Sequence, residues 1–158
     1  MKVLFVAPRF PAPSTHGDRL RAFYLIRELS KRHALTLIAP PNLDPDVRVL
    51  DYCRRWVRVQ PQPVRRIAHT LRGLPGRLPL QTLLFCEPAL QQAARRLQRE
   101  EQFDVVHLHT ARVGPAAVAG QVCVLDYIDA LSLNMQRRAQ HESLPLRLAL
   151  QIESRRMQ

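Results

Sequence analysis

The chain has 158 residues, a length typical of one domain. Apolar residues make up 46% of it, which is enough for a packed core and excludes a wholly disordered chain. The charge is unbalanced, because 24 Lys and Arg face 13 Asp and Glu and leave a net charge of +11. This composition also excludes collagen-like, coiled-coil and acidic disordered proteins.

The sequence contains no apolar run of about 18 residues, so it predicts no transmembrane helix. The apolar run at the start ends at Pro8 and is too short for a secretory signal. The cysteines form no Cys-x-x-Cys pair, and the sequence predicts neither a disulfide framework nor a zinc site. We therefore expect a cytoplasmic protein with no resident metal or cofactor.

The first part of the chain predicts a strand, a loop, a helix and two further strands. Residues 2–7 predict a strand, because the run over 3–7 is continuously apolar and rich in β-branched and aromatic side chains, as in a strand buried on both faces. A proline-rich loop closes on Gly17, and Asp18 is placed to cap a helix that runs to about residue 32. Residues 35–39 and 56–59 predict the second and third strands.

The excess positive charge lies in the middle of the chain, where residues 51–100 carry ten arginines and three acidic side chains. Within it, residues 63–84 mix arginines with apolar side chains, and Val64, Ile67 and Leu71 recur at helical spacing. The arginines of this basic segment are Arg65, Arg66, Arg72 and Arg77. Its apolar face either packs on the core or docks on an anionic membrane surface. Nucleic acid is the less favoured partner, because no DNA-binding motif accompanies the charge.

The second part of the chain continues the alternation of helices and strands. We expect a helix from Pro88 to about residue 101, a strand over 103–109, a helix over 112–119, a strand over 122–125 and helical structure from Leu131, interrupted by Pro145. This order predicts an α/β fold: a Rossmann-like parallel sheet of about five strands with helices on both faces. Ligands bind such sheets at the carboxyl ends of the strands.

Polar residues follow the first strand at the point where its loop enters the helix. They are His16, Gly17 and Arg19. A glycine here allows close backbone approach, and a helix amino terminus favours an anion such as a diphosphate. An ordinary loop-to-helix entry would use the same residues. No G-x-G-x-x-G, P-loop or G-x-S-x-G motif occurs, which argues against the usual dinucleotide, nucleotidase and hydrolase sites.

Histidines and aspartates lie at the ends of the fourth and fifth strands. His107 and His109 share one face of a strand, and His109 is nearer the carboxyl edge. They either contact a sugar or phosphate or are core histidines paired within the protein, and a metal pair lacks a third ligand. Asp126 and Asp129 can accept hydrogen bonds from a polyol, although Asp129 can instead cap the next helix.

Taken together, these segments resemble the N-terminal half of a GT-B glycosyltransferase of the retaining family 4 type. The segments that carry the resemblance are residues 2–8, the proline loop closing on Gly17, residues 19–37, residues 103–109 and residues 124–132. The last of these is similar to a subgroup associated with bacterial exopolysaccharide and exosortase gene clusters. The resemblance covers nearly the whole chain.

The resemblance implies transfer of a sugar from a nucleotide-sugar donor to a glycan or lipid-linked acceptor. It places Gly17 against the donor diphosphate and His109, as the catalytic residue, near the transferred sugar, with His16, Arg19, Asp126 and Asp129 as substrate contacts. Residues 1–130 correspond to the acceptor-side domain and 131–158 to the start of a linking helical segment. The basic segment would then hold the protein on the inner face of the membrane.

Two differences from the family are visible in the sequence. His16 stands where the family commonly has a second glycine, and we expect residues 131–158 to supply no donor-binding C-terminal domain. We therefore expect the chain to be inactive alone. Two other functions stay open: a non-catalytic basic module for anionic lipid or nucleic acid, and a small self-contained enzyme that acts through His109 and Asp126 or Asp129.

Overall fold

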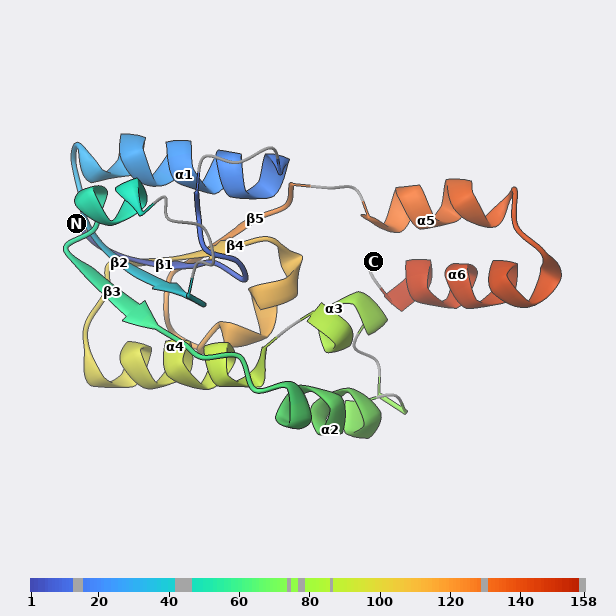
Figure 1. Ribbon diagram of the computed structural model, residues 1–158. Helices are drawn as coiled ribbons and strands as arrows, with labels where there is room; N and C mark the ends of the chain where they lie inside the picture. Colours follow the sequence, from blue (N-terminus) through green and yellow to red (C-terminus); the bar gives the residue numbers. More distant parts are fainter. Residues whose placement is uncertain are drawn as a thin grey trace.

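The computed structural model describes residues 1–12, 16–41, 47–73, 75–76, 79–85, 87–128 and 131–156. One parallel sheet in the order β3-β2-β1-β4-β5 forms its centre (Figure 1). Its strands are β1 (Lys2–Val6), β2 (Ala34–Ala39), β3 (Arg55–Arg58), β4 (Val105–His109) and β5 (Cys123–Asp126). The predicted Rossmann-like α/β fold with a five-stranded parallel sheet is confirmed.

The position of strand β1 explains why its residues 3–6 are all apolar. Val3 and Phe5 belong to a core that includes side chains of α1 (Gly17–Ser30), whereas Leu4 and Val6 belong to a second core with α4 (Pro88–Glu100). Figure 1 shows α1 and α4 on opposite faces of the sheet. Because successive side chains of a strand point to opposite faces, a central strand covered on both sides must be apolar throughout.

The strand order brings the predicted site to a recognisable place. Strand β1 lies between β2 and β4, and the chain returns to β4 only after it has passed through β3 and three helices. The order of strands therefore reverses at β1 and β4, and the crevice at their carboxyl ends is where ligands bind in sheets of this kind.

Two local predictions were wrong. The helix expected over 112–119 is a short 3-10 helix, η2 (Ala111–Ala116), because Gly114 and Pro115 disfavour continuous α-helix. Asp18 does not cap α1. The cap residue is His16, and Asp18 lies in the first turn, where a carboxylate still favours the helix electrostatically.

The basic segment forms two helices, α2 (Pro63–Gly73) and α3 (Leu80–Phe85). The apolar face of α2 does not pack on the core, since Val64, Ile67 and Leu71 are 79%, 60% and 61% exposed. Of the two interpretations that the sequence leaves open for this face, packing on the core therefore does not fit any of the three residues. Arg77 lies outside the described residues.

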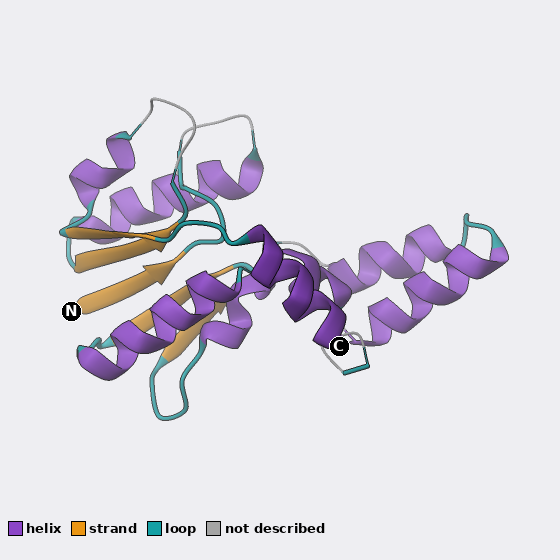
Figure 2. Cartoon of the chain, turned by 60° about the horizontal axis from the view of Figure 1, so that its bottom comes forward, coloured by secondary structure: helices purple, strands orange, loops and turns teal. Residues whose placement is uncertain are grey.

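The last helices, α5 (Leu131–Ala139) and α6 (Leu144–Arg156), form a hairpin beside the sheet domain. Figure 2 shows this hairpin projecting away from the sheet. The predicted interruption is the turn before Leu144, and Pro145 sits in the first turn of α6, where a helix does not need its N–H. Within the described ranges, every helix falls short of the length and apolar character that a membrane crossing requires.

Candidate functional site

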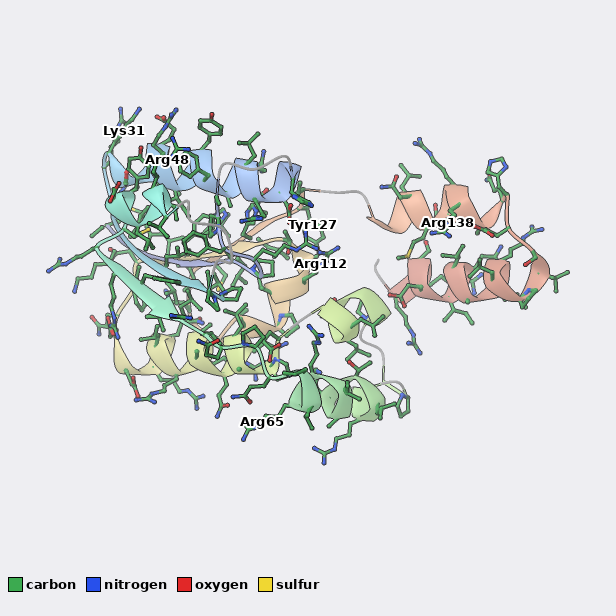
Figure 3. The ribbon with its side chains drawn as sticks, in the orientation of Figure 1. Lys31, Arg48, Arg65, Arg112, Tyr127 and Arg138 are labelled. Atoms are coloured by element: carbon green, nitrogen blue, oxygen red, sulfur yellow. The ribbon has the colours of Figure 1, made fainter. Side chains whose placement is uncertain are left out.

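A pocket of about 340 Å³ lies at the carboxyl edge of the sheet. It is lined by Arg9, His16, Gly17, Asp18, Thr110, Ala111, Arg112, Tyr127 and Ile128. These residues follow β1, β4 and β5, the three strand ends at which the sequence predicts a site. Figure 3 shows Arg112 and Tyr127 at the end of the sheet nearest α5. Among the described residues of its lining are two arginines and one aspartate, so this part of the lining is cationic on balance.

The amino end of α1 forms one wall of this pocket. His16 has extended backbone and makes no side-chain capping bond, while its carbonyl accepts a hydrogen bond from the N–H of Leu20. A Cβ added at Gly17 would meet no described atom within 4 Å, so packing does not require glycine there. The open space and the helix amino end are both compatible with an anion, and the predicted diphosphate contact at Gly17 stays a prediction.

Arg19 is directed elsewhere. Its Nε donates a hydrogen bond to the carbonyl oxygen of Phe10 at 3.0 Å, and this contact ties the proline-rich loop to α1. It does not line the main pocket. Of the three residues predicted around the first loop, His16 and Gly17 therefore line the pocket, and Arg19 positions the loop that carries them.

A polar network lies beside the pocket and joins three elements. Arg21 of α1 donates two hydrogen bonds to Asp126, Nε to Oδ2 at 2.9 Å and Nη2 to Oδ1 at 3.0 Å. His109 of β4 has its Nδ1 3.5 Å from Oδ2 of the same carboxylate. The hydrogen bonds from the Arg21 guanidinium hold the pKa of the Asp126 carboxyl below its ordinary value, and the Asp126 carboxylate in turn raises the pKa of Arg21. The structure thus brings together His109 and Asp126, two residues that the sequence predicted for the site.

The contacts of His109 determine its tautomer. Its Nε2 lies 2.9 Å from the carbonyl oxygen of Asp18, and because a carbonyl only accepts, Nε2 must carry the proton. Burial lowers the pKa of His109, so the ring is neutral and Nδ1 holds a lone pair. A proton taken up at Nδ1 would be stabilised by Asp126. His109 is only 2% exposed, so contact with a substrate requires a local movement, and its catalytic role stays a prediction.

His107 is a core residue. Its ring stacks on Phe5 with 4.5 Å between ring centroids, and its Nε2 is buried without a hydrogen-bond partner among the described residues. Burial lowers the pKa of His107 to about 4, so it is neutral at pH 7. The interpretation of His107 as a core histidine therefore fits the structure better than a substrate contact.

His107, His109 and Asp126 bring potential metal-ligand atoms within 4.8 Å of one another. Asp126 is the third ligand that the sequence alone could not supply. Both of its oxygens, however, already accept hydrogen bonds from the Arg21 guanidinium. A metal ion would have to displace that cation, so we interpret the cluster as a hydrogen-bonded network rather than a metal centre.

Five residues of this region were not anticipated from the sequence. They are Arg9, Arg21, Thr110, Arg112 and Tyr127. Four of them lie in the segments that directly follow β1, β4 and β5, with Arg112 in η2, so their position after a strand was an available signal. Nothing in the sequence pairs Arg21 with a carboxylate so distant in the chain. Asp129 lies outside the described residues.

A second pocket, of about 400 Å³, lies at the opposite, amino edge of the sheet. Lys2, Arg54 and Arg55 line it together with Thr36 and Glu101. It is larger and more cationic than the carboxyl-edge pocket. It is nevertheless the weaker candidate, because it lies on the edge where parallel sheets do not usually bind ligands and its Arg55 is paired with Glu101.

Comparison with known proteins leaves the family open. No family model, curated protein or solved structure matches the chain. Arguments about function therefore depend on the residues and geometry described above.

Proposed function

We propose that residues 1–130 form the N-terminal, acceptor-side domain of a nucleotide-sugar-dependent glycosyltransferase that acts in polysaccharide or lipid-linked glycan synthesis, and that residues 131–158 begin a linking helical segment. The observation that supports this most directly is the pocket at the carboxyl ends of β1, β4 and β5, the position of ligands in sheets of this order. The motif resemblance supplies the reaction class, and the Rossmann-like fold is compatible with it.

The chemistry of the pocket suits a phosphorylated, hydroxyl-rich ligand. Arg9, Arg112 and the amino end of α1 favour phosphate oxygens, and the His109–Asp126 network lies next to them. A pocket of about 340 Å³ is near the lower end of the range of roughly 300–1,000 Å³ for small-molecule sites. It can hold part of a nucleotide sugar or of a lipid-linked acceptor, and the remaining contacts would come from a second lobe.

A turnover assay tests this proposal. Purified protein is incubated with a panel of nucleotide sugars, and release of nucleoside diphosphate is followed. We expect no turnover, because one wall of the cleft cannot orient donor and acceptor together. Turnover at ordinary enzyme rates, about 1–10³ per second, would contradict the domain role and favour the self-contained enzyme. His109→Ala would then show whether the activity depends on that residue.

A second function, attachment to an anionic membrane surface, is favoured by one specific observation. The helix α2 exposes Val64, Ile67 and Leu71 on one face, and Arg65, Arg66 and Arg72 lie in the same helix. Exposed apolar side chains flanked by cations are the signature of a helix that lies in the interface of an anionic bilayer. This attachment is compatible with a lipid-linked acceptor and does not compete with the first proposal.

Flotation with vesicles tests the attachment. Each cation near an anionic surface contributes about 1 kcal/mol, so Arg65→Gln combined with Arg66→Gln is expected to weaken binding by roughly 30-fold. Arg137→Gln combined with Arg138→Gln, which also removes two positive charges but from α5, is the control (Arg138 is labelled in Figure 3). Ile67→Ser should release the protein even at low salt. Equal binding of all variants, or preference for duplex DNA over vesicles across a salt series, would contradict the proposal.

A further inference from the structure

Thr110 has a backbone conformation that its side chain disfavours. It follows His109 directly and has φ 78° and ψ 151°, and it is the one non-glycine residue with positive φ among the described ranges. Almost only glycine adopts this combination of φ and ψ. A β-branched residue in this conformation costs at least about as much free energy as the loss of a hydrogen bond. A hydrogen bond from the Thr110 N–H to the carbonyl oxygen of Asp126 helps to hold the backbone in this strained conformation.

The side chain of Thr110 adds an independent observation. Its hydroxyl oxygen is buried and has no hydrogen-bond partner among the residues that the structure describes. Thr110 also lines the carboxyl-edge pocket, next to Arg112. A covered, unpaired hydroxyl is unfavourable, so a ligand oxygen in the pocket that bonded this hydroxyl would remove the penalty.

The charges around this position favour an anion. Arg112 follows Thr110 by two residues, and Arg9 and the amino end of α1 line the same pocket. Asp18 is the only acidic side chain among the described lining residues, and its carboxylate is 3.5 Å from the Arg9 guanidinium. The described lining therefore carries a net positive charge beside a helix terminus that also favours negative charge.

We infer that Thr110 is a ligand-binding residue whose hydroxyl bonds a phosphate oxygen of a diphosphate group held between Arg9, Arg112 and the amino end of α1. This inference rests on the proposed function and names the residues through which its site recognises the ligand. A diphosphate occurs both in a nucleotide-sugar donor and in a polyprenyl-linked acceptor. The chemistry of the contact is the same for both.

Calorimetric titration with pyrophosphate, UDP and farnesyl diphosphate tests the inference and distinguishes the two sources. Thr110→Val keeps the shape of the side chain and removes the hydroxyl, so it should weaken binding about tenfold or more. Thr110→Ser keeps the hydroxyl and should stay within about twofold of the wild type. Arg112→Gln should weaken binding in the same way, whereas Arg138→Gln, on α5, should not. Tighter binding of UDP than of farnesyl diphosphate would indicate that the site takes the donor. Tighter binding of farnesyl diphosphate would indicate that it takes the acceptor.

Thr110→Gly separates a binding role from a structural one. Glycine removes the backbone strain, so the melting temperature should rise by about 3–5 °C, while diphosphate binding should fall at least as far as in Thr110→Val. If Thr110→Val and Thr110→Gly both bind diphosphate as tightly as the wild type does, the role of Thr110 is overturned and the proposed function still stands. A wild-type protein that binds none of the three probes would overturn both.

Discussion

Acidification should destabilise this protein through His107. The ordinary histidine pKa is 6.5, and burial lowers the pKa of His107 to about 4 in the folded state. Between these two values the unfolded chain binds a proton that the folded protein does not. Stability therefore falls as the pH is lowered from about 6.5 to about 4, and the full contribution of His107 is present above that window.

The size of this effect follows from the two pKa values. They differ by about 2.5, and each unit of difference corresponds to about 1.4 kcal/mol, so His107 should account for a loss of about 3 kcal/mol. Domains of this kind have total stabilities of about 5–15 kcal/mol, so the loss is large enough to measure. His109 and Asp126 act in the same direction, because the pKa of each is also lowered in the folded protein.

Urea unfolding at pH values from 7 to 4 measures the loss. His107→Phe keeps an aromatic ring against Phe5 and removes the titrating group, so its stability should fall by about 3 kcal/mol less than that of the wild type over this range. His141→Gln, at an exposed position after α5, should follow the wild type. Equal losses in the wild type and in His107→Phe would refute the reasoning.

Three further predictions concern stability and can be checked by urea unfolding at pH 7. Arg21→Gln leaves the Asp126 carboxylate, whose side chain is 9% exposed, without its guanidinium, and should cost about 1–2 kcal/mol. The matched change Arg27→Gln removes an exposed pair with Glu28 and should cost less than about 0.5 kcal/mol, so equal costs would argue against a stabilising network. Ile26→Ala, at a fully buried position, should lower the free energy of unfolding by about 2–5 kcal/mol, whereas Ile67→Ala, on the exposed face of α2, should lower it by well under 1 kcal/mol. A large loss of stability for Ile67→Ala would mean that this face is packed in solution. Gly120→Ala should cost about 1 kcal/mol, because Gly120 has φ +82°, and an unchanged midpoint would contradict that conformation.

The sheet was predictable because its signals are local. The run over residues 3–7 is apolar at every position, as in a strand covered on both faces, and the alternation with helices implies parallel strands. That His107 and His109 share a face was also predictable, because side chains two residues apart in a strand point to the same side of the sheet. The 3-10 helix at 111–116 was also within reach, since Gly114 and Pro115 disfavour an α-helix there.

The parts that sequence reasoning missed depend on tertiary packing. The spacing of Val64, Ile67 and Leu71 predicts an apolar face correctly, but whether a neighbour covers that face is decided by the placement of α2. The bond between Arg21 and Asp126 joins residues 105 positions apart, and no local pattern reports it. The left-handed backbone of Thr110 is likewise invisible in a sequence that offers no glycine at that position.

The most direct test of the account is to map where a diphosphate binds. Isotope-labelled protein is titrated with UDP, and the backbone amide signals are followed by NMR. The account predicts shifts at residues 17–18, 110–112 and 127–128, around the carboxyl-edge pocket. Shifts confined to Lys2, Arg54 and Arg55 at the amino edge would show attraction by charge alone, and would contradict the claim that the carboxyl ends of β1, β4 and β5 form the functional site.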